Sequence, residues 1–198
     1  MEGGDQKKKS RAAVFGARLF STLLLWVVVG AVFLSGRQDV LVLAVAVLGA
    51  FGALEFYRLT ARIPGTDCRV WAMIVSLGYL GALTWGYLNG TFVEPVSGGS
   101  FLPEAAALVL VVLGGFTLRL RHEIAGPESV VPVTMGLLSL VYVPVLFAGF
   151  TIRLSFLPPD GAGDHAGAWL VLFVVLVTKF SDMGAYAVGS LIGKHKAI

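Results

Sequence analysis

The stretch Ala168–Ile192 reads AWLVLFVVLVTKFSDMGAYAVGSLI and is apolar along most of its length. It is long enough to cross a membrane, because about 20 apolar residues span the ~30 Å hydrocarbon layer of a bilayer. Lys179, Ser181 and Asp182 nevertheless lie inside it. A central lysine or aspartate costs about 2.5–3.5 kcal/mol on insertion scales, so such groups are expected to pair, to face a wet cavity or to take part in chemistry. Function is therefore expected in this stretch.

The composition of the whole chain is that of an integral membrane protein. Of its 198 residues 57% are hydrophobic and only 14% are charged, whereas soluble domains carry about 25% charged residues. The single cysteine, Cys68, excludes an internal disulfide framework. The net charge of +3 does not indicate nucleic-acid binding, and no nucleic-acid partner is expected.

Apolar segments alternate with short polar connections along the chain. None shows the strict alternation of a β-barrel strand, which favours an all-α, polytopic membrane protein with about six transmembrane helices. Residues 1–13 are expected to form a basic tail and residues 14–198 the membrane domain. The six predicted spans are Val14–Leu34, Val40–Phe56, Val70–Leu88, Ala105–Leu118, Val130–Phe150 and Ala168–Ile192.

Basic residues gather on one side of this predicted topology. They are Lys7, Lys8, Lys9, Arg11, Arg18, Arg58, Arg62, Arg69, Arg119, Arg121, Lys194 and Lys196. The predicted loops on the opposite side contain only Arg37 and Arg153. The positive-inside rule then places both termini in the cytoplasm. The expected location is the cell inner (plasma) membrane, which the chain crosses several times.

Three interpretations of the polar residues in the last segment remain open. Lys179, Asp182 and Tyr186 follow at i, i+3 and i+7, which places them on one helix face. The lysine and aspartate could form a structural ion pair, belong to a proton or ion pathway, or line a polar site for cytoplasmic substrates. Transporters usually distribute ionisable groups over several facing helices. Ser181 begins a row of small residues that suits helix packing.

A basic stretch, Gly193-Lys194-His195-Lys196, follows the last segment directly. It could be an ordinary positive-inside anchor, or its lysines could bind phosphate near the membrane surface. Phosphoryl and nucleotidyl transfer need charge neutralisation and positioning more than covalent chemistry from the protein. A carboxylate such as Asp182, helping to hold Mg²⁺ beside phosphate-facing lysines, would supply both.

The stretch Ser181–Lys196, SDMGAYAVGSLIGKHK, resembles a segment of phosphatidate cytidylyltransferases (CDP-diacylglycerol synthases). That segment is written A/S-D-S/T-x-A-Y-x-x-G-x-x-x-G-K-x-K, and Met183 departs from it where serine or threonine is usual. The family continues with P-x-x-S-P-x-K-T-x-E-G and a signature containing H-G-G-x-x-D-R-x-D, which these 198 residues do not contain. The chain is therefore expected to be the N-terminal part of such an enzyme and to show no such activity on its own.

The resemblance implies a reaction of CTP with phosphatidate in the lipid bilayer that gives CDP-diacylglycerol and pyrophosphate, with Mg²⁺ as cofactor. It implies Asp182 as the catalytic residue, holding the metal or orienting the nucleotide. The substrate-binding residues that it implies are Ser181, Tyr186, Lys194, His195 and Lys196. Whether two copies form a homodimer is left open by the sequence. The alternative is a non-enzymatic membrane module or small transporter with a structural Lys179–Asp182 pair.

Overall fold

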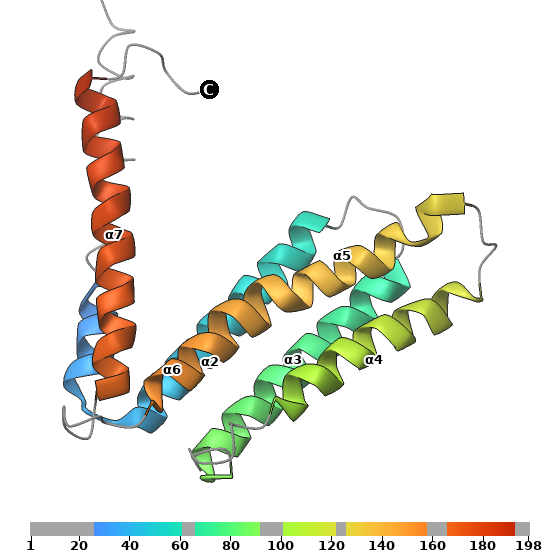
Figure 1. The fold of residues 1–198 in the computed structure, drawn as a ribbon, viewed down its shortest axis with the longest axis horizontal. Coiled ribbons are helices and arrows are strands. Elements are labelled where there is room, and N and C mark those ends of the chain that lie inside the picture. Colours follow the sequence, from blue (N-terminus) through green and yellow to red (C-terminus); the bar gives the residue numbers. More distant parts are fainter. Residues whose placement is uncertain (1–25, 61–65, 92–100, 122–125, 158–165, 193–198) are drawn as a thin grey trace, which may run out of the picture.

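The computed structural model describes residues 26–60, 66–91, 101–121, 126–157 and 166–192, and all regular elements within these ranges are helical. The predicted all-α fold is therefore confirmed. Residues 26–34 form a helix that precedes the labelled elements (Figure 1). The others are α2 (Gln38–Leu59), α3 (Thr66–Leu88), α4 (Leu102–Arg119), η3 (Gly126–Ser129), α5 (Val131–Leu140), η4 (Val141–Gly149), α6 (Phe150–Ser155) and α7 (Ala166–Ile192).

Five stretches of the described residues are long and apolar enough to cross a membrane. They are Gln38–Leu59, Asp67–Leu88, Leu102–Arg119, Val131–Ser155 and Ala166–Ala185. The prediction of a multi-span membrane protein is confirmed, because five of the six predicted segments reappear with shifted ends. The remaining one, the first, is described only over residues 26–34, and the predicted basic tail lies outside the described residues.

The fifth predicted segment is a composite of α5, η4 and α6. Pro132 lies in the first turn of α5, where its missing N–H removes no helical hydrogen bond. Pro144 lies inside η4, which is π-helical over Val141–Gly149. In a regular α-helix its ring would clash with the carbonyl four residues before it. The π-helical turns of η4 accommodate Pro144, and the span continues without a break into α6.

Helix α3 lies at the centre of a bundle in which it contacts α2, α4 and α5. Its Leu83 is fully buried, together with Val42 of α2, Val111 of α4 and Leu140 of α5. Large apolar side chains on the outside of the helices are exposed, as a bilayer permits. Cys68, at the start of α3, is buried within the same bundle.

Helix α7 contacts the bundle near its N-terminus and then departs from it (Figure 1). A Cβ atom at Gly167 would lie 2.5 Å from the carbonyl oxygen of Ser155, so only glycine permits this approach to α6. Further along, every residue from Val177 to Ala185 is exposed. The polar residues of the last predicted segment therefore lie on a helix that the described residues leave mostly uncovered.

Candidate active site

The polar stretch of α7 is helical because an apolar segment without proline satisfies all its backbone groups internally, as a bilayer requires. Lys179 and Asp182 lie about one turn apart on this helix. Thr178, beside them, donates its hydroxyl hydrogen to the carbonyl oxygen of Val174 at 2.8 Å, so its polarity is used within the helix.

The side chains of Lys179, Ser181 and Asp182 are all exposed. Within the part of the chain that the structure describes, no ion pair joins Lys179 to Asp182. The structural-pair interpretation therefore has no support from the described geometry, and the Asp182 carboxylate is open to an external ligand. The row of small residues that begins at Ser181 had suggested packing against another helix. In the described residues Ser181 is instead exposed.

Several predicted site residues cannot be placed. The side chain of Tyr186 and the residues Lys194, His195 and Lys196 lie outside the described residues, so their roles stay predictions. Because α7 is helical to Ile192, Asp182 lies about 15 Å from the end of the helix at 1.5 Å per residue.

The donor chemistry of this helix bears on the Mg²⁺ that the resemblance implies. Among the described residues, no group of three or more histidine, cysteine, aspartate or glutamate side chains could hold a metal ion. Mg²⁺ is usually bound by one or two carboxylates together with substrate phosphates, not by an all-protein cage. Asp182 is an exposed carboxylate of that kind. The described residues thus fit a metal shared with a nucleotide.

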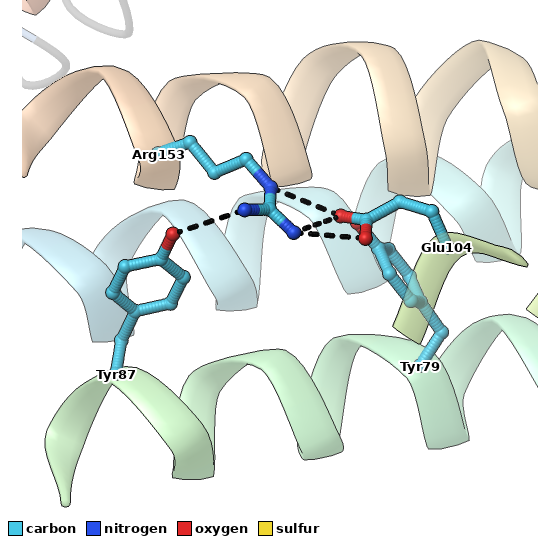
Figure 2. Close-up of polar contacts among 4 residues, drawn as sticks. All are labelled: Tyr79, Tyr87, Glu104 and Arg153. Atoms are coloured by element: carbon cyan, nitrogen blue, oxygen red, sulfur yellow. Dashed lines mark hydrogen bonds and ion pairs between the residues drawn. The ribbon is translucent and has the colours of Figure 1, made fainter. Parts of the chain in front are cut away.

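A second polar cluster, which the sequence analysis missed, lies inside the bundle (Figure 2). Arg153 of α6 donates from Nε and Nη2 to Glu104 Oε1 at 3.1 and 2.8 Å, and from Nη2 to Oε2 at 2.8 Å. Tyr79 donates its hydroxyl hydrogen to Glu104 Oε1 at 3.0 Å, and the Tyr87 hydroxyl accepts from Arg153 Nη1 at 3.5 Å. The guanidinium carbon also lies 5.0 Å from the centre of the Phe101 ring. The cluster joins α3, α4 and α6.

This cluster corrects the predicted positions of two charges. Arg153 was placed in a loop, but α6 continues to Ser155 and holds it in a helix. Glu104 lies in the first turn of α4, just outside the predicted span. The side chains are only 19% and 12% exposed, and burial of unpaired charges would be costly. The sequence did contain a signal for this pair, because two opposite charges lie at the edges of two apolar segments. The predicted segment ends left both residues outside the spans, so the pair was missed.

A glycine makes room for the cluster. A Cβ atom at Gly149, the last residue of η4, would collide with the hydroxyl of Tyr79. Because that hydroxyl binds Glu104, the missing side chain allows α3 and η4 to approach closely enough for the tyrosine to complete the cluster. The charged groups of the cluster are paired, which suits a structural role in holding α3, α4 and α6 together.

The fold and the polar stretch of α7 define a multi-span membrane protein with an exposed intramembrane carboxylate. Comparison with protein families then gives the class: the model of the cytidylyltransferase family matches residues 16–198. The chain belongs to the cytidylyltransferase family, which confirms the resemblance of the Ser181–Lys196 motif and supports nucleotidyl transfer that uses CTP. Neither a curated protein nor a solved structure matches the chain.

Proposed function

We propose that this protein transfers the cytidylyl group of CTP to phosphatidate and so produces CDP-diacylglycerol and pyrophosphate. Family membership supports a CTP-dependent nucleotidyltransferase in a membrane. Phosphatidate as the acceptor rests on the Ser181–Lys196 motif. The observation that carries the proposal is the exposed Asp182 carboxylate, which has no ion-pair partner among the described residues although it lies in an apolar membrane helix.

In the proposed reaction a phosphate oxygen of phosphatidate attacks the α-phosphorus of CTP. The bond from that phosphorus to the oxygen bridging to the β-phosphate breaks, and pyrophosphate leaves with the electron pair. Asp182 orients the nucleotide and would hold Mg²⁺, which when bound neutralises phosphate charge. Lys194 and Lys196 face phosphate groups, with Ser181, Tyr186 and His195 as supporting contacts.

The proposed site opens to the cytoplasm of a cell whose inner (plasma) membrane holds the protein. Two observations support this sidedness. Basic residues are concentrated in the connections at the Ile192 end of α7, as the positive-inside rule requires. CTP is water-soluble, and Asp182 lies about 15 Å from the Ile192 end of α7 but about 24 Å from its Ala166 end.

The experiment is a transfer assay with the full-length protein in membranes, CTP labelled at the α-phosphate, and added lipid acceptors. We expect labelled CDP-diacylglycerol with phosphatidate, and no labelled lipid when phosphatidate is replaced by diacylglycerol, which lacks the attacking phosphate. If labelled lipid forms with another acceptor but not with phosphatidate, CTP-dependent nucleotidyl transfer still holds but the proposed substrate is wrong.

A further inference from the structure

Two buried side-chain atoms in the described part of the chain have no hydrogen-bond partner, Nε of Arg119 and Oγ of Ser129. Arg119 is the last residue of α4, and Ser129 is the last residue of η3, just before α5. The serine is only 8% exposed. Buried polar groups in proteins are nearly always hydrogen-bonded, and one without a partner in the protein indicates a bound water or ion.

The packing of α4 against α5 brings these two residues to facing turns. The helices are antiparallel (Figure 1), and a Cβ atom at Gly115 of α4 would lie 3.1 Å from Cγ1 of Val133 in α5. Arg119 follows Gly115 by four residues, which is about one turn toward the end of α4. Ser129 precedes Val133 by the same number, and Val130 between η3 and α5 has helical backbone angles. Both side chains therefore lie at the same end of the bundle and on the contact between the two helices.

The surroundings of this point favour a negative charge. Arg119 forms no ion pair with a described residue. Helices α3 and α5 both begin here, since Cys68 in the first turn of α3 donates from Sγ to the carbonyl oxygen of Gly115 at 3.6 Å. Helix N-termini present unpaired N–H groups and a partial positive charge. Asp67, the acidic residue in the first turn of α3, is exposed and takes part in an interaction of its own. The group that the arginine and the serine lack is thus an anion.

The position of the two residues along the spans identifies the kind of anion. Arg119 is the last residue of one stretch that can cross the membrane, and the next begins at Val131, two residues after Ser129. Leu120 and Val130, beside them in sequence, are exposed, which suits contact with acyl chains. The phosphates of phospholipids lie at this level, just outside the hydrocarbon layer. The connections at this end are also the basic ones, and anionic lipids gather at the cytoplasmic surface.

We propose that Arg119 and Ser129 bind a phosphate group, and that this phosphate belongs to a phospholipid of the cytoplasmic leaflet. A guanidinium binds phosphate through two parallel N–H···O bonds, and a further phosphate oxygen accepts the hydroxyl hydrogen of Ser129. The bound lipid completes the polar groups that the protein leaves unpaired and joins the ends of α4 and α5. No residue of the Ser181–Lys196 motif takes part, so the proposal does not rest on the proposed function.

The test is native mass spectrometry of the full-length protein in detergent with a fixed excess of dioleoylphosphatidylglycerol. Arg119→Gln should lower the retained phospholipid about tenfold or more, because hydrogen bonds to a charged group are lost. Arg121→Gln removes an exposed arginine two residues further along, so it is the matched control and should retain the lipid. Equal retention by the two variants overturns the proposal. A millimolar excess of inorganic phosphate should not displace the lipid, and complete displacement would overturn the lipid as the source of the phosphate.

A second measurement does not depend on the folding of an arginine variant. Ser129→Asp places a carboxylate opposite Arg119 and so supplies the missing anion from within the chain. This variant should unfold at a higher temperature than Ser129→Asn in lipid-free detergent, and it should retain less lipid than Ser129→Asn, which has the same shape without the charge. If the aspartate variant is no more stable than the asparagine variant, or retains as much lipid, Arg119 and Ser129 do not form an anion site and the proposal is wrong.

Discussion

Removing the charge of Glu104 should destabilise the bundle strongly. Glu104→Gln keeps the size of the side chain but leaves the Arg153 guanidinium without a counter-charge in a site where it is 19% exposed. Breaking one member of a buried ion pair costs about 3–5 kcal/mol. The contacts of Arg153 with Tyr87 and Phe101 remain, so we expect the lower end of this range, about 3 kcal/mol. That is roughly a hundredfold or larger change in the unfolding equilibrium.

The assay is equilibrium unfolding by dodecyl sulfate in mixed micelles, followed by circular dichroism. The matched control is Glu55→Gln, because Glu55 pairs with Arg58 at 2.9 Å while both side chains are 66% and 75% exposed. An exposed pair contributes about 0–1 kcal/mol. The control should therefore unfold at nearly the same dodecyl sulfate fraction as the unaltered protein.

The double variant Glu104→Leu with Arg153→Met decides whether the two charges act as a unit. Replacing both members of a buried pair is often neutral, so the double variant should recover most of the stability that Glu104→Gln loses. If the single variant behaves like the Glu55 control, or if the double variant loses more than the single one, the reasoning about this cluster is refuted.

Two further predictions concern packing and topology. Gly149→Ala should lower the free energy of unfolding by about 1–3 kcal/mol in the same assay, because its Cβ would collide with the Tyr79 hydroxyl. The control Gly78→Ala should not lower it, since a Cβ there meets open space. Equal stability of the two variants would contradict the packing account. The topology is tested in a background without Cys68, with one cysteine introduced at the exposed position Arg121 or Asn89. The cysteine at Arg121 should react with a membrane-impermeant thiol reagent only after the cytoplasmic face is opened, whereas the one at Asn89 should react in intact cells. The opposite pattern would reverse the proposed orientation.

The helices were predictable because hydrophobic length alone determines which segments span a bilayer. The span ends were less predictable. Glu104 and Arg153 looked like loop charges, but α4 and α6 include them, and their pairing across the two helices offsets the cost of burying them. The π-helical stretch around Pro144 likewise depends on how its neighbours pack.

The candidate site was predictable as a set of residues but not as an arrangement. Asp182 could be identified from the sequence because inserting a carboxylate into an apolar membrane segment costs free energy, so such residues usually have a function. Spacing could not decide between an ion pair with Lys179 and an open carboxylate, since both use the same helix face. That choice depends on which neighbours cover α7, and in the described residues the side chains from Val177 to Ala185 are exposed.

The most direct test of the central claim is CDP-diacylglycerol synthesis and folded yield for Asp182→Asn in the full-length protein, beside the double variant Lys179→Met with Asp182→Asn. If the carboxylate serves the nucleotide, synthesis should fall about a hundredfold or more in both variants. Folded yield of the single variant should hardly change, because Asp182 has no ion-pair partner among the described residues. A double variant that is stable and fully active would contradict the account, because Asp182 would then only balance the charge of Lys179.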